Sequence, residues 1–248
     1  MQKVVDVSPA SVPGRTAISR PHPTQRSIMS ATIQEQSQEL SAASALRLPP
    51  EVASVFGAEV QRWRDQGEPD GIVRAGETIE VFALPDATGA DVSLGEILAE
   101  GPAVLVFYRG GWCPYCNIAL RTYQTELLPQ LERYGARLIA ISPQRPDESL
   151  NTKEKAELSF TVLSDPAAGI ARRLGIAFTP SEESLSAQRK LGLDLAQVNE
   201  TVDLPMPTVL IVDPNRVVHF ADTHADYTSR TEVSEIVAAL EALEDGAS

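Results

Sequence analysis

Beyond residue 72, short hydrophobic runs alternate with amphipathic segments. Apolar runs typical of buried strands lie at residues 103–108, 138–141, 160–163, 208–213 and 217–220. Between and after these runs, apolar residues recur every three or four positions, which predicts helices, among them one over about 113–134 and a last one over about 231–243. The alternation predicts an α/β fold in which a central mixed β-sheet is flanked by helices on both faces.

The part of the chain before residue 72 follows a different pattern. Residues 1–28 are rich in Ser, Pro, Thr and Arg and lack an apolar period, so we interpret them as a disordered tail or as a mis-assigned start before Met29; a transit peptide is the alternative. Residues 29–71 are weakly helical, with Val52, Phe56 and Val60 at helical spacing after Pro50. We therefore expect an N-terminal extension made of a tail (1–28) and a helical lead-in (29–71), followed by the main domain (72–248).

Composition and charge exclude several classes of partner. The 248 residues include 34 acidic and 21 basic side chains, a net charge of −13 that repels nucleic acids. No apolar run approaches the roughly 20 residues of a membrane helix, so we expect no membrane partner. The two cysteines cannot form a four-cysteine zinc site, and His22, His219 and His224 lack metal-type spacing. We expect a cytoplasmic protein without metal or other cofactor.

The two cysteines form a C-x-x-C motif, Cys113-Pro114-Tyr115-Cys116, between a predicted strand and a predicted helix. Amide groups at a helix start stabilise a thiolate, and Pro114 suits the first helical position. A second sulfur one turn along can resolve a mixed disulfide or a sulfenic acid. Since the chain has no other cysteine, we expect an intramolecular Cys113–Cys116 disulfide. A pair of inert buried cysteines is the alternative.

The run FYRGGWCPYC resembles the active-site segment of the peroxiredoxin-like branch of the alkyl hydroperoxide reductase C and thiol-specific antioxidant superfamily. It is also similar to the WCGPC motif of thioredoxin and the CPYC motif of glutaredoxin. The resemblance extends over about residues 77–244, including FALPDATGADVSL, LPMPTVLIVDPNRVVHF and DYTSR. It implies a thioredoxin-like fold and a thiol-dependent antioxidant oxidoreductase.

The chain departs from both families at the motif. In the peroxiredoxin pattern P-x-x-x-T-x-x-C, Cys116 takes the place of the peroxidatic cysteine and Cys113 that of the threonine, while the usual arginine before the later strand falls on Pro207. We interpret Pro207 instead as similar to the cis-proline that faces the dithiol in thioredoxins; a residue that simply starts an edge strand is the alternative. The acid that bacterial thioredoxins bury before their motif is replaced by Phe107. The resemblance thus names Cys116 for attack on peroxides and Cys113 for attack on disulfides. We expect Cys113 to be the more exposed sulfur and, at the helix start, the better stabilised thiolate.

Several neighbours of the motif are candidates for supporting roles. Trp112 and Tyr115 are candidate contact residues, and Arg109 can polarise a peroxide or stabilise a thiolate; ordinary packing and an exposed strand-end arginine are the alternatives. Three residues of the DYTSR segment, Asp226, Tyr227 and Arg230, are interpreted as bracing and capping the last helix. We interpret His219 and His224 as strand and loop residues rather than catalytic bases.

The function that the resemblance implies is the reduction of hydroperoxides through a Cys113/Cys116 dithiol–disulfide cycle. The implied partners are a hydroperoxide or disulfide substrate and a thiol reductant, either thioredoxin or a low-molecular-weight thiol. A thioredoxin-type protein disulfide reductase is the alternative enzyme; it requires an open hydrophobic face around Trp112 and Pro207. A non-catalytic module that uses the dithiol as a redox-sensing clasp is the alternative from another class.

Overall fold

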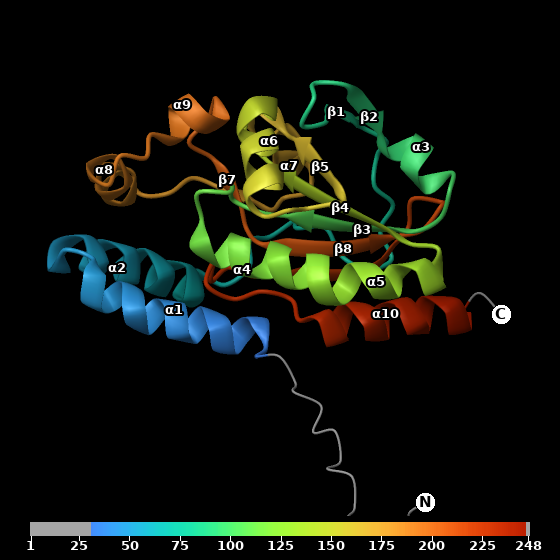
Figure 1. Ribbon diagram of the computed structural model, residues 1–248, viewed down its shortest axis with the longest axis horizontal. Helices are drawn as coiled ribbons and strands as arrows, with labels where there is room; N and C mark the ends of the chain where they lie inside the picture. Colours follow the sequence, from blue (N-terminus) through green and yellow to red (C-terminus); the bar gives the residue numbers. More distant parts are fainter. Residues whose placement is uncertain (1–30, 247–248) are drawn as a thin grey trace, which may run out of the picture. The chain divides into compact units, whose positions relative to one another are not determined.

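A five-stranded mixed sheet forms the centre of the computed structural model, which describes residues 31–246 (Figure 1). The strand order is β5-β4-β3-β8-β9; β3, β4 and β5 are parallel, β8 is antiparallel to β3, and β9 is antiparallel to β8. The bounds are β3 Ala103–Phe107, β4 Arg137–Ser142, β5 Thr161–Ser164, β8 Thr208–Val212 and β9 Val218–Thr223. The predicted mixed sheet is confirmed. The predicted tail at 1–28, and positions 29–30 of the lead-in, lie outside the described residues.

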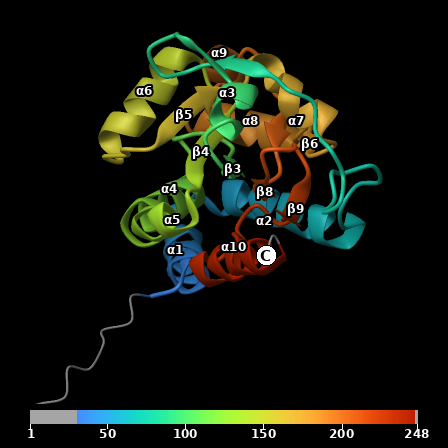
Figure 2. The same ribbon diagram turned by 90° about the vertical axis from the view of Figure 1, so that its right-hand side faces the viewer.

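Both faces of the sheet are covered by helices, as predicted. Successive residues of a strand point to opposite faces, so Ala103, Leu105 and Phe107 join one hydrophobic cluster while Val104 and Val106 join another. The first cluster includes α3 and α7, and the second includes α4, α5 and α10; Figure 2 shows these two groups on opposite sides of the sheet. The bounds are α3 Leu94–Leu98, α4 Pro114–Thr122, α5 Leu128–Leu131, α7 Gly169–Arg173 and α10 Val233–Gly246.

The helix predicted after the C-x-x-C motif is continuous but irregular. A π-helical segment, Tyr123–Leu127, joins α4 to α5, and a 3₁₀ turn, Glu132–Tyr134, follows. Pro129 explains the wide turn, because its ring clashes with a regular preceding turn and it has no N–H to donate. Gly135 ends the helix in the left-handed region, with φ of 57°.

Two helices, α1 (Ile33–Arg47) and α2 (Pro50–Gln66), form the segment ahead of the sheet. A capping box of Thr32 and Glu35 starts α1, and Pro50 occupies the first position of α2. The amide of Ile33 donates to the Glu232 carboxylate at 3.1 Å, which connects α1 to the segment that precedes α10. The two views agree that α1 lies beside α10 (Figures 1 and 2). The described residues form one compact unit.

The remaining elements are short or lie near the edges. The predicted helices near 148–158 and 182–191 are α6 (Pro146–Lys155) and α8 (Glu182–Lys190). The hairpin β1 (Ala83–Pro85) and β2 (Asp91–Ser93), the two-residue strands β6 (Ala177–Phe178) and β7 (Leu204–Pro205), and the helix α9 (Leu195–Asn199) complete the fold. None of the described helices is long and apolar enough to cross a membrane.

Candidate active site

Two glycines shape the loop that connects β3 to the C-x-x-C motif. Gly110 has a φ of 144°, and a Cβ there would lie 2.4 Å from Trp112 Nε1. A Cβ on Gly111 would lie 2.1 Å from Thr152 Oγ1. The Gly111 amide donates to Gln144 Oε1 at 2.7 Å. Both positions exclude a side chain, and the loop thereby delivers the motif to the start of α4.

The two cysteines lie at the N-terminus of α4. Cys113 is the N-cap residue, Pro114 is the first helical residue, and Cys116 follows one turn along. The two sulfurs are not bonded to each other, and the exposed fractions are 1% for Cys113 and 0% for Cys116. Cys113 is the more exposed sulfur, as predicted, but only by this small margin, because surrounding side chains cover the helix start.

Arg230 is the group that distinguishes the two sulfurs. Its Nη2 lies 3.1 Å from Cys116 Sγ and 4.0 Å from Cys113 Sγ, and the arginine is 9% exposed. Burial by itself raises the pKa of Cys116, but a hydrogen bond from Cys113, the charges of Arg230 and Arg109, and the Arg109 backbone amide together hold that pKa well below its ordinary value. These contacts favour Cys116 as the thiolate of the pair.

Cys113 shows the opposite shift. Burial, followed by the neighbouring Cys116 thiolate, raises the pKa of Cys113 well above its ordinary value, and the charges of Arg109 and Arg230 offset this only in part. The two shifts favour Cys113 as the thiol and Cys116 as the thiolate, which is the opposite of the expectation that Cys113 is the better stabilised thiolate.

Arg109 supplies a second buried positive charge. Its guanidinium carbon lies 4.1 Å from the ring centre of Tyr227 and 5.0 Å from that of Trp112, and the residue is 6% exposed. Cation–π contacts of this kind hold an arginine without neutralising it. The interpretation of Arg109 as an exposed strand-end residue is wrong, whereas its expected place beside a thiolate agrees with the geometry.

A cavity of about 750 Å³ opens onto the motif. Trp112, Pro114 and Tyr115 line it beside Cys113, and Cys116 is not among the lining residues. The Tyr115 hydroxyl is 3.0 Å from Ser41 Oγ, which connects α4 to α1 across one side of the cavity. All three predicted contact residues are therefore brought together around Cys113.

Pro207 is not the cis-proline facing the dithiol that the sequence predicted. No cis peptide bond occurs in the described chain, so the bond before Pro207 is trans, and the residue is buried away from the cavity lining. Its carbonyl accepts from the His224 amide at 2.9 Å, which extends the pairing of β8 with β9. Pro207 thus serves as the lead into a strand, and the cis-proline interpretation is wrong.

The DYTSR segment carries the residues that the sequence interpretation misplaced. Arg230 contacts the sulfurs and Tyr227 stacks on Arg109, while Asp226 accepts from Thr228 and pairs with Arg64 of α2 at 2.5 Å. None of these contacts caps α10. Interpreting the three residues as bracing the last helix was wrong for Arg230 and Tyr227, which are site residues.

The histidines stand apart from the dithiol. His219 in β9 pairs with Asp213 at 3.1 Å, and His224 after β9 pairs with Asp222 at 3.0 Å. Neither lines the cavity beside Cys113. Within residues 31–246, no group of three or more His, Cys, Asp or Glu residues is arranged to hold a metal ion.

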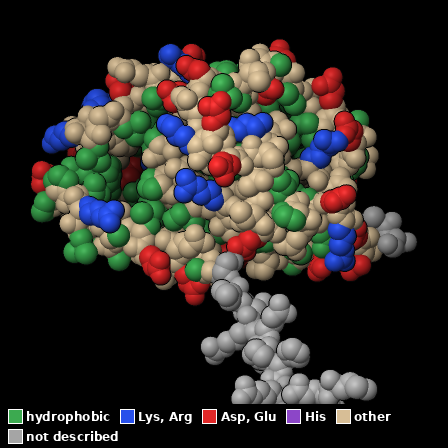
Figure 3. All heavy atoms as spheres, in the orientation of Figure 1, with side chains coloured by type: hydrophobic (Ala, Val, Ile, Leu, Met, Phe, Trp, Pro, Cys, Tyr) green, Lys and Arg blue, Asp and Glu red, His purple; other side chains and the backbone are tan. Residues whose placement is uncertain are grey.

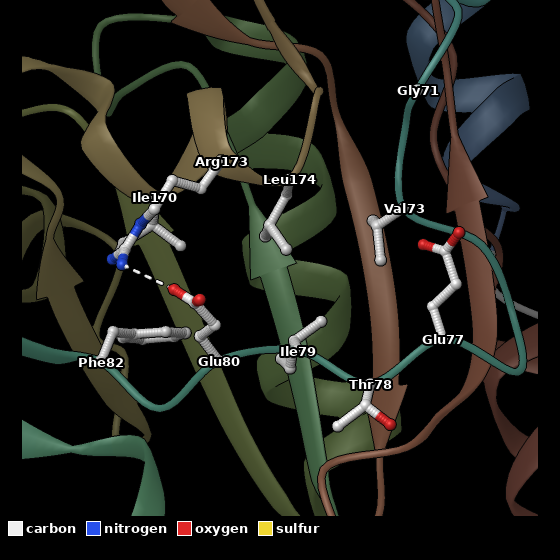
Figure 4. A pocket seen from close by; sticks show the side chains of 10 residues that line it. All are labelled: Gly71, Val73, Glu77, Thr78, Ile79, Glu80, Phe82, Ile170, Arg173 and Leu174. Carbon is white, nitrogen blue, oxygen red and sulfur yellow. Dashed lines mark hydrogen bonds and ion pairs between the residues drawn. The ribbon is translucent and has the colours of Figure 1, made fainter.

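A second cavity, of about 380 Å³, is lined by no cysteine (Figure 4). Figure 4 shows Ile79, Phe82 and Leu174 around it, with Glu80 facing Arg173. The Glu80–Arg173 ion pair, at 3.4 Å, is largely exposed, so it contributes little. Of the two cavities, only the one beside Cys113 is lined by a cysteine.

Comparison with known proteins identifies the family. The AhpC/TSA family matches residues 75–221, more than half of the chain, and the chain therefore belongs to this family of peroxiredoxin-like thiol oxidoreductases. Peroxiredoxin Bcp of Escherichia coli is 30% identical over 105 residues, which make up 42% of this chain and 65% of Bcp. The chain thus spans a little under two thirds of that relative.

Solved structures agree on the fold. The crystal structure of peroxidoxin BcpB from Mycobacterium tuberculosis matches 69% of this chain and 98% of its own, with a TM-score of 0.54 at 21% identity. AhpC of Enterococcus faecalis matches 70% of this chain and 93% of its own, with a TM-score of 0.55 at 17% identity. These likenesses confirm the thioredoxin-like peroxiredoxin fold.

Proposed function

We propose that this protein is a thiol-dependent peroxidase in which Cys116 is the peroxidatic residue and Cys113 the resolving residue. The observation that carries the proposal is the 3.1 Å contact between Arg230 Nη2 and Cys116 Sγ, with its effect on the pKa of that thiol. Only a thiolate attacks a peroxide efficiently. Arg230 supplies, from the segment before α10, the charge that the peroxiredoxin pattern places at the position of Pro207.

The reaction needs two steps at the dithiol. The Cys116 thiolate attacks the outer oxygen of a hydroperoxide, so that the O–O bond breaks, the sulfur becomes a sulfenic acid and an alcohol or water leaves after taking a proton. The Cys113 thiol then attacks that sulfur, which forms the Cys113–Cys116 disulfide and releases water. The hydrogen bond between the two sulfurs supports a condensation without large movement.

The alternative enzyme, a protein disulfide reductase, fits the geometry less well. Such an enzyme must present its attacking sulfur on an open face, yet Cys113 is 1% exposed and Pro207 is buried. The pKa of Cys113, raised by burial and the neighbouring thiolate, also disfavours it as the first nucleophile. We propose a thiol compound as electron donor and keep the cytoplasm as the proposed location.

The test is peroxide consumption by the wild type and by each cysteine variant. Hydrogen peroxide and an organic hydroperoxide are mixed with the reduced protein, and non-reducing mass spectrometry follows the product. The wild type should lose two hydrogens without dimer formation, and Cys116→Ser should consume no peroxide. A wild type that consumes none, or that forms mainly a disulfide-linked dimer, contradicts the proposal.

A further inference from the structure

The cavity beside Cys113 has the size of a small-molecule site. Its volume of about 750 Å³ lies within the roughly 300–1,000 Å³ typical of ligand pockets. Its walls come from α1, α2, α8 and the loop after α8, with Leu48, Phe56 and Leu193 among the apolar residues. Figure 3 shows hydrophobic side chains gathered around a hollow at the left, where α2 and α8 lie. A molecule in this cavity would meet Cys113 and not Cys116.

The cover over Cys113 favours a small reductant over a protein. A reducing thiolate must come within bonding distance of a sulfur, about 2 Å. The contacts Tyr115–Ser41 and Arg64–Asp226 connect the covering helices α1 and α2 to the main domain, and Cys113 is 1% exposed beneath them. A protein thiol on a folded surface is too broad to enter such a cavity, whereas a small thiol can enter.

A buried acceptor without a partner in the cavity wall indicates one chemical group that the small thiol would need. Gln188, 5% exposed, lines the cavity, and its Oε1 has no hydrogen-bond partner within residues 31–246. A buried acceptor left unpaired is unfavourable, so an N–H donor from a ligand would complete this site. The described lining includes Arg64 and Arg109 and no carboxylate.

The buried positive charges near the dithiol favour an anionic reductant. When the dithiol is oxidised, Cys116 no longer carries the negative charge that faces Arg230 and Arg109. Two buried positive charges then lack their anion, which favours entry of an anionic thiolate and, beside it, a carboxylate. An oxidised site of this kind attracts its own reductant.

We infer that the electron donor is a low-molecular-weight thiol that carries a carboxylate and an N–H donor, bound between α1, α2 and α8 and attacking Cys113; this inference rests on the proposed function. The donor thiolate forms a bond to Cys113 Sγ, the Cys113–Cys116 bond breaks, and Cys116 leaves as the thiolate that Arg230 stabilises. A second donor thiolate attacks the donor sulfur of the mixed disulfide. It forms the oxidised donor and releases Cys113, which takes up a proton. Low-pKa thiols are the better leaving groups, which sets this direction of attack.

The test isolates the reductive half of the cycle. The full chain is oxidised with diamide, which needs no peroxidase activity, and its reduction is followed by tryptophan fluorescence and thiol titration. The probes are glutathione, its diethyl ester and reduced thioredoxin at matched thiol concentrations. Glutathione should reduce the disulfide fastest and with saturation. In the reverse direction, oxidised glutathione should form a mixed disulfide on Cys113 of Cys116→Ser, with release of one glutathione thiolate, faster than on Cys116 of Cys113→Ser.

Matched variants of α2 test the place of binding. Gly57 lines the cavity, and a Cβ there would meet nothing within 4 Å, so Gly57→Leu should narrow the cavity without a clash at Cβ. Reduction by glutathione should slow about tenfold. The exposed neighbour Ala58 does not line the cavity, and Ala58→Leu should stay within about twofold. Gln188→Leu should weaken saturation by glutathione about tenfold.

Two outcomes would overturn the inference: faster reduction by thioredoxin than by glutathione, or equal rates for Gly57→Leu and Ala58→Leu. A failure of the proposed function would appear in the reaction with peroxide instead. In that case peroxide leaves the reduced dithiol unchanged, while the diamide-formed disulfide still reports on the donor.

Discussion

Cys113 and Cys116 lie one helical turn apart, yet their surroundings differ in charge and in access. Cys113 caps α4 and borders the cavity, and its pKa is raised; Cys116 is fully buried against Arg230, and its pKa is lowered. A helix N-terminus stabilises an anion by at most about 2 kcal/mol. Two charges 4 Å apart interact by about 4 kcal/mol at an effective dielectric constant near 20. A nearby buried arginine therefore outweighs the helix N-terminus, and Arg230 lies closer to Cys116 than to Cys113.

Replacing Arg230 should remove the difference in pKa between the two sulfurs, and we expect the largest change in reaction rate from it. In Arg230→Met the buried Cys116 thiolate loses its closest positive charge, its pKa rises, and oxidation by hydrogen peroxide at neutral pH should slow about 100-fold. Stopped-flow tryptophan fluorescence of the reduced protein measures the rate. Arg230→Lys retains the charge and should recover part of it. A rate for Arg230→Met within a few-fold of wild type would mean that Arg230 does not set the reactivity of Cys116.

The pH dependence sharpens the same comparison. Because the pKa of Cys116 lies well below the ordinary value, the thiolate is complete above that pKa, and the wild-type rate should be flat near neutral pH. The rate should fall about tenfold per pH unit once the pH drops below that pKa. In Arg230→Met the fall should begin at a higher pH. Ultraviolet absorbance of the thiolate checks the titration independently, and a wild-type rate that still climbs tenfold per unit through neutral pH would contradict the assignment.

Arg109 should matter less than Arg230, since its charge makes the smaller contribution to the pKa of Cys116. Arg109→Leu should slow peroxide oxidation about tenfold and move the thiolate titration to higher pH. Arg109→Lys keeps the charge but loses the planar stacking on Tyr227, so it should lie between the leucine variant and the wild type. Equal rates for the lysine and leucine variants would show that packing, rather than charge, is the contribution of Arg109.

The smallest expected effect comes from a change in α2, one of the helices that cover Cys113. Glu59 of α2, with a side chain 4% exposed, accepts hydrogen bonds from Arg62, Trp63 and the Ser181 amide. Burial raises its pKa, but these donors outweigh burial and lower it. The stabilisation it provides is thus present above the pKa of the unfolded carboxyl and lost as the pH falls through the folded pKa.

Glu59→Gln should therefore cost about 1–3 kcal/mol of the free energy of unfolding at neutral pH, and less in acid. Urea denaturation at both pH values measures this. Alkylation of Cys113 should also become faster, because α2 is one of its covers. Equal losses at the two pH values would mean that the charge of Glu59 has no part in the effect.

The sheet and the motif were within reach of sequence reasoning. The run of residues 103–107 is apolar throughout because β3 is buried on both faces, and Pro114 marks the start of α4. Short elements such as β6 and α9 were missed, because two to five residues cannot display a period.

The environment of the two sulfurs could not be predicted from the sequence. Arg230 lies 114 residues from Cys116 along the chain, and only the fold brings the two together. The resemblance of DYTSR to a family pattern was the available signal, but it carries no direction for the side chain. The near-complete cover over Cys113 could not be predicted for the same reason, because the covering residues come from α1, α2 and α8.

The measurement that tests the central claim most directly is the site of sulfenic acid formation. Reduced Cys113→Ser and Cys116→Ser are each treated with one equivalent of hydrogen peroxide in the presence of dimedone, and peptide mass spectrometry locates the label. The account predicts that Cys113→Ser is labelled on Cys116 and that Cys116→Ser is not labelled. A label on Cys113 in Cys116→Ser, with none in Cys113→Ser, would contradict it.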